Sequence, residues 1–365
     1  MAEKKTIAFY CSSLTKGGAE RVFANLAEYF TEKGYTVYMV TQYKQEDEYG
    51  LKPGITRILS DITPGEEKNG RIDNFFARFF KLRNIFKKIK PDIVFSCNGK
   101  NNFMAECAGM GLHCKTVVSV VADPKMEYPT KLMCLLAKVL FRFADGIVFQ
   151  TKEAMDFFPK AVRKKGVILP NSLNPQFIRE RFEGEREKEI VAVGRLDDNK
   201  NHAMLIEAFA EIKDDFPDYR VVIYGEGEDR SKLEKLVAKR KLDGRVSLPG
   251  RTDKIEEKIY KSSLFVMTSD TEGMPNALIE AMSLGLCVIS TDCPCGGPRE
   301  LITPGKNGYL VPVRDTEALK EQLVYCLSHP EETEDVGREA ARIQESMAPD
   351  SVNRKWEEYF GKVMG

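Results

Sequence analysis

The chain has 365 residues, and its 55 lysines and arginines match its 55 aspartates and glutamates, so the formal net charge is zero. This length exceeds that of a typical single core and predicts two domains. The charge balance argues against a protein that binds nucleic acid over its whole surface, so no nucleic-acid partner is expected. The sequence contains no run of 18 apolar residues, which argues against a membrane-spanning helix.

The nine cysteines are scattered through apolar segments, as expected of a reduced, cytoplasmic protein. The N-terminal segment lacks the apolar core and cleavage site of a signal peptide, which favours the same location. Cys293 and Cys295 come nearest to a metal motif, but no second pair and no neighbouring histidine accompanies them. We therefore expect neither a metal site nor a bound cofactor.

Apolar runs typical of strands alternate with amphipathic runs typical of helices through the first half of the chain. Near-continuous apolar strands separated by helices predict a parallel sheet with helices on both faces. The predicted strands are 6–12, 36–42, 56–62, 92–98, 115–121, 146–151 and 166–171, and the predicted helices are 19–33, 71–89, 101–111, 130–143 and 152–158.

The alternation stops near residue 171, where a polar segment with glycine and proline is typical of a linker. It then resumes, and the tail from about residue 331 is predicted to be helical only. The second set of predicted strands is 189–195, 219–225, 245–250, 263–269, 287–292 and 308–313, with helices at 200–214, 229–241, 253–261, 275–285 and 315–328.

The predicted fold class is therefore α/β, with two doubly wound, Rossmann-like domains facing across a cleft. The predicted boundaries are an N-terminal domain at 1–170, a linker at 171–187, a second domain at 188–345, and a C-terminal helix at 346–365 that packs back on the first domain. Ligands of such folds bind beyond the carboxyl ends of the strands, so we expect the site in the cleft.

A glycine pair follows the first predicted strand. Gly17 and Gly18 open the turn into a helix that Glu20 and Arg21 begin. Glycines let a ligand approach the backbone closely, and the N–H groups at a helix start favour an anion. The alternative is an ordinary tight turn between a strand and a helix, with no ligand.

Arg195 and Lys200 flank the loop after the first strand of the second domain. A planar guanidinium group and a flexible ammonium group five residues apart suit a diphosphate. The alternative is a pair of solvated surface cations that bind nothing.

Residues 268–285, TSDTEGMPNALIEAMSLG, place a helix start between two carboxylates. Pro275 suits the first position of that helix. The N–H groups of Asn276, Ala277 and Leu278 then lack partners inside the helix and are expected to bind an anion.

The two carboxylates of this stretch suit hydroxyl groups. Glu280 lies about one turn into an otherwise apolar helix, where it can accept two hydrogen bonds from the vicinal diol of a ribose. Glu272, in the loop before the helix, can reach the hydroxyls of a sugar beyond the phosphates. The alternative is a helix with one charge near its start and one glutamate at the edge of the core.

Three motifs together resemble the retaining glycosyltransferases of family 4, which have the two-domain GT-B fold. They are GGAE at 17–20, GRL with a following lysine at 194–200, and two glutamates eight positions apart at 272–280. The match is best from about 187 to 312, and its last part, CPCGGPRELITPGKNGYLVP, looks like the bacterial branch that builds capsule, exopolysaccharide and lipid-linked glycans.

The resemblance implies a role for each matching residue. Arg195 and Lys200 would bind the donor diphosphate and stabilise its charge during catalysis, Glu280 would bind the ribose, and Glu272 would contact the transferred sugar. The loop with Gly17 and Gly18 would approach the distal phosphate. The loop and helix start at Gly273, Met274, Pro275, Asn276, Ala277 and Leu278 would meet that phosphate and the sugar, and Arg251 and Thr252 would hold the base, expected to be uracil.

The activity that the resemblance implies is a retaining, metal-independent transfer of a hexosyl or N-acetylhexosaminyl group. The donor would be a nucleotide diphosphate sugar, expected to be UDP-linked and bound by the second domain. The acceptor, on the side of the first domain, would be a glycan or a polyprenyl-linked glycan of bacterial surface polysaccharide synthesis. Two alternatives stay open: a nucleotide-sugar epimerase on a GT-B scaffold, and a non-catalytic sugar-nucleotide-binding partner.

The segment SVVADP at 119–124 departs from the family pattern. In the branch nearest to this sequence we expect an arginine and an asparagine where Val121 and Ala122 stand. Asp123 remains, and the resemblance places it among the catalytic residues, where it would orient the acceptor or the donor sugar.

The predicted helix at 71–90 is both aromatic and basic. It carries seven lysines and arginines and one aspartate, a net charge of +6. Such a helix suits a peripheral contact with anionic lipid at the inner face of the plasma membrane. The alternative is a core helix with a basic solvated side. Its apolar residues at helical spacing are Phe75, Phe79, Leu82, Phe86 and Ile89, flanked by Phe76 and Phe80.

Overall fold

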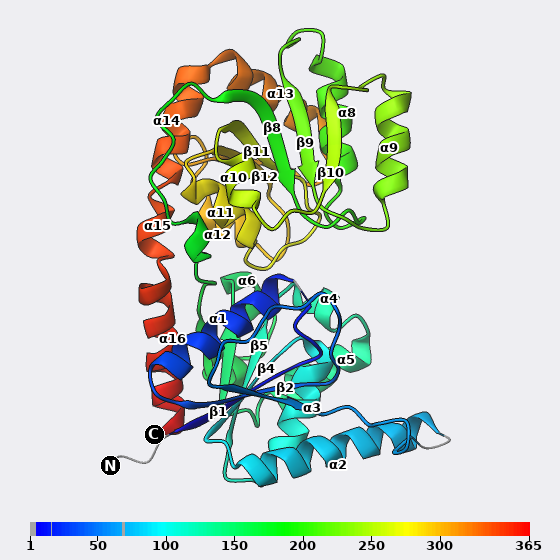
Figure 1. Cartoon of the computed structure of the whole chain (residues 1–365), viewed down its shortest axis with the longest axis vertical. Coiled ribbons are helices and arrows are strands. Elements are labelled where there is room, and N and C mark those ends of the chain that lie inside the picture. Colours follow the sequence, from blue (N-terminus) through cyan, green and yellow to red (C-terminus); the bar gives the residue numbers. More distant parts are fainter. Residues whose placement is uncertain (1–4, 16, 68–69) are drawn as a thin grey trace. The chain divides into compact units, whose positions relative to one another are not determined.

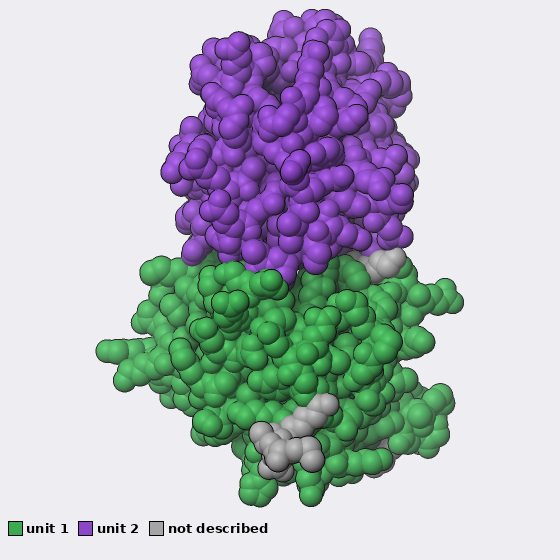
Figure 2. All heavy atoms as spheres, turned by 60° about the vertical axis from the view of Figure 1, so that its left-hand side comes forward, with its two compact units in different colours: residues 1–171, 350–365 green, residues 172–349 purple. Residues whose placement is uncertain are grey.

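The computed structural model describes residues 5–15, 17–67 and 70–365, and the chain divides into two compact units. Unit 1 comprises residues 1–171 and 350–365, and unit 2 comprises residues 172–349; Figure 2 draws them in green and purple. Each unit has its own sheet and its own apolar core, so the predicted pair of α/β domains is confirmed.

Unit 1 is built on a seven-stranded parallel sheet with the order β3-β2-β1-β4-β5-β6-β7. The chain starts in the middle, moves to one edge, returns and then moves to the other edge, as in doubly wound folds (Figure 1). All seven strands predicted from the sequence are present. Their bounds are β1 (Thr6–Cys11), β2 (Thr36–Thr41), β3 (Ile55–Leu59), β4 (Ile93–Cys97), β5 (Lys115–Val120), β6 (Gly146–Phe149) and β7 (Gly166–Ile168).

Alternate residues of the central strands point to opposite faces of this sheet and pack under different helices. Phe9 and Phe95 lie in the cluster of α1 and α16, whereas Ala8 and Tyr10 lie in the cluster of α2 and α3. The helices of unit 1 are α1 (Gly18–Glu32), α2 (Arg71–Ile89), α3 (Gly99–Gly109), α4 (Pro124–Glu127), α5 (Lys131–Leu140), α6 (Lys152–Asp156), α7 (Lys160–Arg163) and α16 (Pro349–Met364).

The last helix, α16, belongs almost entirely to unit 1. Trp356 packs against Phe95, with ring centroids 5.2 Å apart, and its indole N–H donates to the carbonyl of Pro170 at 3.4 Å. Phe360 stacks on Phe30 of α1, with centroids 5.3 Å apart. The C-terminal residues thereby complete the core of the first half of the sequence.

Unit 2 repeats the topology with six parallel strands in the order β10-β9-β8-β11-β12-β13. The strands are β8 (Glu187–Val193), β9 (Arg220–Tyr224), β10 (Val246–Gly250), β11 (Ser262–Met267), β12 (Cys287–Thr291) and β13 (Tyr309–Val311). The helices are the 3-10 helix η1 (Pro175–Phe177), α8 (His202–Ile212), α9 (Arg230–Lys239), α10 (Ile255–Ile259), α11 (Asn276–Ser283), α12 (Gly297–Leu301), α13 (Thr316–Ser328), α14 (Pro330–Ala340) and α15 (Ile343–Ser346).

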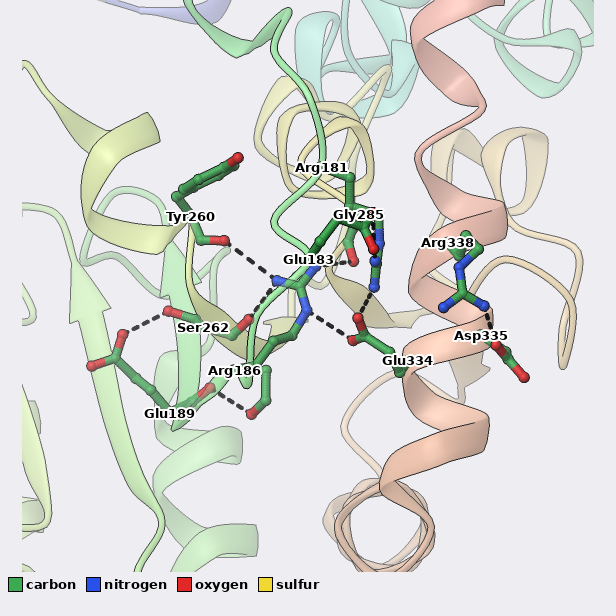
Figure 3. Close-up of polar contacts among 11 residues, drawn as sticks. Arg181, Glu183, Arg186, Glu189, Tyr260, Ser262, Gly285, Glu334, Asp335 and Arg338 are labelled. Atoms are coloured by element: carbon green, nitrogen blue, oxygen red, sulfur yellow. Dashed lines mark hydrogen bonds and ion pairs between the residues drawn. The ribbon is translucent and has the colours of Figure 1, made fainter.

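The segment expected to be a linker, 171–187, lies within unit 2 from residue 172 onward. Arg186 is buried there and donates to the carbonyls of Ser262 at 3.0 Å and Gly285 at 2.7 Å, and to the carboxylate of Glu334 at 2.9 Å (Figure 3). Arg181 pairs with the same carboxylate. The polar composition that suggested a linker therefore comes from arginines that tie this segment to β11, to the loop after α11 and to α14.

Candidate functional site

The loops that follow β8 and β11 are joined at the carboxyl edge of the unit 2 sheet. The Asn199 side-chain amide donates to the carbonyl of Thr271 at 3.1 Å, and the backbone N–H of Asp270 donates to the carbonyl of Asn199 at 2.8 Å. The Thr268 hydroxyl donates to the carbonyl of Lys200 at 2.9 Å. Because β8 and β11 are neighbouring parallel strands, their ends emerge side by side, and these bonds fix the two loops as one surface.

Lys200 and Glu272, predicted separately to bind phosphate and sugar, form an ion pair across this surface. The hydroxyl of Ser269 donates to the same carboxylate oxygen at 2.6 Å. The Lys200 side chain is 19% exposed and that of Glu272 is 13% exposed. Because both side chains are mostly buried, the attraction between their charges is stronger than in an exposed ion pair. The ammonium and the carboxylate are therefore positioned before any ligand arrives.

Arg195 lies on the same loop with a different environment. Its side chain is 77% exposed and pairs with Asp197, Nη2 to Oδ2 at 2.9 Å. Its carbonyl lies 3.2 Å from Nε2 of His202, the first residue of α8. Burial, followed by the nearby Lys200 charge, lowers the pKa of His202 to about 4, so its neutral ring can donate to that carbonyl at pH 7. The backbone of the loop is thus fixed while the guanidinium group reaches into solvent.

The segment after β12 forms hydrogen bonds with the backbone of Glu272. Sequence reasoning missed this contact. The N–H of Glu272 donates to the carbonyl of Pro294 at 2.7 Å, and the N–H of Cys295 donates back to the carbonyl of Glu272 at 3.0 Å. A Cβ on Gly297 would collide with the carbonyl of Gly273, so only glycine fits there. The signal was present in CPCGGPRE, because adjacent glycines before a helix often mark such a close backbone approach.

Helix α11 begins one residue later than expected. Pro275 caps the helix with extended backbone, and Asn276 is the first helical residue. The N–H of Leu278 donates to the carbonyl of Pro275 at 3.1 Å, so the prediction that this amide lacks a partner in the helix was wrong. Glu280 lies on α11 and is buried at 6% exposure among Leu278, Ala281 and other apolar side chains.

Arg251 and Thr252 lie at the same edge of the sheet, directly after β10. The loop after β9 connects them to the Arg195 loop, since the N–H of Leu196 donates to the carbonyl of Glu226 at 2.9 Å and the N–H of Gly225 donates to the carbonyl of Gly250 at 3.0 Å. Unit 2 therefore presents the predicted phosphate, sugar and base residues along one row of strand ends. Within this row, Lys200 and Glu272 are in direct side-chain contact.

Gly17, Gly18 and Asp123 lie in unit 1, beyond the carboxyl ends of β1 and β5. Gly17 precedes α1 with extended backbone, and Gly18 is the first residue of that helix. Asp123 caps α4, where its carboxylate accepts from the N–H of Lys125 at 2.9 Å. The predicted residues of unit 1 are thus all at helix starts that follow strands of its sheet.

Glu127 is a further residue of this region that the sequence did not reveal. One carboxylate oxygen accepts from the N–H of Val121 at 2.6 Å and from that of Ala122 at 2.8 Å. Burial raises the pKa of Glu127 to about 7, although these hydrogen bonds oppose the shift. Val121 and Ala122, where the family pattern differs, are therefore held through their backbones, and Asp123 follows directly.

Two features are absent from the part of the chain that the structure describes. No group of three or more histidine, cysteine, aspartate or glutamate side chains is placed to hold a metal ion. Within the same residues, none of the helices combines the length and apolar character needed to span a bilayer.

Two family models match the chain. The model for glycosyl transferases group 1 matches residues 174–343, and the model for glycosyltransferase family 4 matches residues 16–177. An α-1,4-N-acetyl-D-galactosaminyltransferase from Campylobacter jejuni, whose name gives a diphospho-undecaprenol-linked glycan as its substrate, is 25% identical over 362 residues, which are 98% of each chain.

Solved structures share the fold over nearly the whole length. The sucrose-phosphate synthase of Thermosynechococcus elongatus superposes with a TM-score of 0.85 at 17% identity and covers 99% of each chain. HepE of Anabaena, solved in complex with UDP, superposes with a TM-score of 0.82 at 16% identity, over 98% of this chain and 100% of its own. With one family model on each half and a full-length structural match, the chain belongs to the glycosyltransferases of family 4 and has the GT-B fold.

Proposed function

We propose that this glycosyltransferase is a retaining, metal-independent hexosyl- or N-acetylhexosaminyltransferase that uses a UDP-sugar. Its acceptor is a glycan or polyprenyl-linked glycan of bacterial surface polysaccharide synthesis. The observation that carries the proposal is the Lys200–Glu272 pair, which places a cation and a hydroxyl-binding carboxylate side by side at the strand ends of unit 2. The lipid-linked substrate named for the Campylobacter relative and the UDP bound by HepE support the choice of acceptor and donor.

In this proposal the residues of unit 2 hold the donor and stabilise its departure. Lys200 and Arg195 stabilise the charge that builds on the diphosphate as the bond to the sugar breaks, and Glu280 binds the ribose hydroxyls. The diphosphate competes with Glu272 for Lys200, which leaves the carboxylate available to the hydroxyls of the sugar. Attack on the same face of the sugar, with the leaving phosphate taking the acceptor proton, needs no side-chain nucleophile.

The activity is tested by supplying UDP-sugars with and without a polyprenyl-diphosphate-linked glycan. We expect free UDP only when both substrates are present, an unchanged rate in EDTA, and a product whose anomeric configuration by NMR equals that of the donor. A changed sugar without any acceptor would support the epimerase alternative. Donor binding by calorimetry with neither UDP release nor a changed sugar would support the non-catalytic alternative.

We also propose that helix α2 brings the enzyme to the inner face of the membrane. Its first half exposes Ile72, Phe75, Phe76 and Phe80, whereas Leu82 and Phe86 of the second half are buried in the core of unit 1. The exposed aromatic residues of the first half support the lipid contact, and the buried residues of the second half fit the alternative of a core helix with a basic solvated side. Part of its positive charge is used inside unit 1, because Arg78 pairs with Asp61, Lys81 pairs with Glu66, and Arg83 donates to backbone carbonyls.

A further inference from the structure

Helix α5 carries an apolar face on the side that points to solvent. Leu132, Leu135, Leu136 and Val139 stand at positions i, i+3, i+4 and i+7 of the helix, and Phe143 lies in the turn after it; they are 64%, 59%, 39%, 40% and 63% exposed. Spacings of this kind put the four helical side chains on one stripe of the helix surface. Met126, in the short helix just before, is 61% exposed as well.

The opposite side of α5 already has a complete packing partner. Ala137 and Phe141 are fully buried, and Phe141 meets Tyr128 and Phe158 with ring centroids 5.9 and 5.7 Å apart. The exposed stripe is therefore not the core-facing side of an amphipathic helix. Helix α5 is apolar on both sides, and a surface helix of a soluble domain normally turns polar side chains outward.

The charged side chains on α5 and in the turn after it are basic. Residues 123–145 contain Lys125, Lys131, Lys138 and Arg142 and three carboxylates, each engaged within unit 1: Asp123 caps α4, Glu127 accepts from the loop after β5, and Asp145 pairs with Lys115. Lys131 is exposed at the start of α5, Arg142 is exposed in the turn after it, and Lys138 lies over the ring of Phe157 at 4.2 Å. An exposed apolar stripe flanked by cations has the chemistry of a helix that lies in the interface of an anionic bilayer.

We propose that the outward face of α5 inserts into the headgroup region of an anionic lipid bilayer and is a second membrane contact, distinct from the first half of α2. A second copy of this chain fits less well, because two such faces packed together would bring like charges against each other, while the neighbouring carboxylates Asp123 and Asp145 are already engaged with the Lys125 N–H and with Lys115. Helix α3 contacts both α2 and α5, so the two lipid contacts belong to one rigid part of unit 1. The inference rests on the proposed function only for the presence of a membrane-bound acceptor.

Flotation with lipid vesicles tests this surface. We expect the full chain to float with phosphatidylglycerol vesicles and to float poorly with phosphatidylcholine vesicles. The triple change Leu132→Ser, Leu135→Ser and Phe143→Ser is expected to lower the bound fraction roughly tenfold, because it removes three of the inserting side chains. The double change Lys131→Glu and Arg142→Glu is expected to abolish the preference for anionic vesicles.

Matched controls distinguish this contact from non-specific hydrophobic binding to vesicles and from an effect on transferase activity. Leu59→Ser with Ile178→Ser removes two other exposed apolar side chains and should leave flotation unchanged. UDP release with a water-soluble acceptor should be equal in the triple variant and the wild type. Flotation does not need this activity, so a chain without transferase activity would still test the lipid contact. The inference is overturned if the triple variant floats like the wild type, or if light scattering shows a dimer that the same changes turn into a monomer.

Discussion

The two units have the same central strand order, but the carboxylates near their strand ends have different partners. In unit 2, Glu272 follows β11 and is paired with Lys200. In unit 1, Glu127 lies beneath the loop after β5, accepts hydrogen bonds from two backbone N–H groups, and has no cation among the described residues within ion-pair distance. The same topology thus supports a charged ligand-binding edge in one unit and a carboxyl group with a raised pKa in the other.

The largest expected effect tests whether the core of unit 1 is stable independently of unit 2. Trp356→Ala removes a buried indole that packs between Phe95 and Phe360, and we expect a loss of about 3–5 kcal/mol in the free energy of unfolding of unit 1. Urea unfolding followed by circular dichroism should then show two transitions, with only the one for unit 1 shifted. A uniform shift of one single transition would contradict independent cores.

The next effect concerns the charged edge of unit 2. Lys200→Ala should lower kcat about a hundredfold, because one charged group that stabilises the leaving diphosphate is lost. Steady-state kinetics with saturating donor measure it, and Lys213→Ala, at the far end of α8, is the matched control. An unchanged kcat would remove Lys200 from the mechanism and leave its pairing with Glu272 as a purely structural contact.

Glu280→Gln tests the carboxylate that lies deeper on α11. Loss of charged hydrogen bonds to the ribose should raise the KM for the donor about tenfold to a hundredfold, with a smaller change in kcat. Glu257→Gln, an exposed glutamate on α10, should change neither constant. An equal loss for UDP-sugars and for analogues without the ribose hydroxyls would show that Glu280 acts through packing instead.

Strand positions and the motifs at strand ends could be predicted because they depend on local patterns. Runs of apolar residues placed all 13 strands, and the same runs placed Lys200 and Glu272 after β8 and β11. What depends on distant partners could not be predicted. The glycines of CPCGGPRE marked a close backbone approach, but the sequence did not show that Pro294 and Glu272 would be the partners. Nor did it show that the Glu127 carboxylate accepts from the N–H groups of Val121 and Ala122.

Helical periodicity has a related limit. The spacing in α2 showed that apolar residues share a face, but it did not show which part of that face the rest of the unit covers. In α2 the face divides, with Leu82 and Phe86 buried and Phe75 exposed. In α5 the outward stripe is apolar because the inner side is already filled by an aromatic cluster, and only the packed structure reveals that. The short helices α4, α7 and α12 contain too few residues to show any period.

The smallest effect is a difference in the pH dependence of stability, and it tests the carboxylate of unit 1. Burial raises the pKa of Glu127 from 4.5 to about 7, with the nearby Asp123 charge adding to the shift, so the native state keeps its proton at a pH where the unfolded chain has lost it. The stability that this group contributes is therefore full below pH 4.5 and is lost as the pH rises toward 7.

In Glu127→Gln the side chain keeps an oxygen that can accept from the Val121 and Ala122 amides but no longer titrates. We expect the free energy of unfolding of unit 1 to fall less between pH 5 and pH 7 than in the wild type, by about 1–2 kcal/mol. Urea unfolding at both pH values measures the difference. Glu106, whose pKa burial also raises to about 7, contributes with the same sign, so Glu106→Gln is the control that must be additive with it. Identical pH profiles for wild type and Glu127→Gln would mean that Glu127 is ionised in the native state, and unit 1 would then hold a charged carboxylate just as unit 2 does.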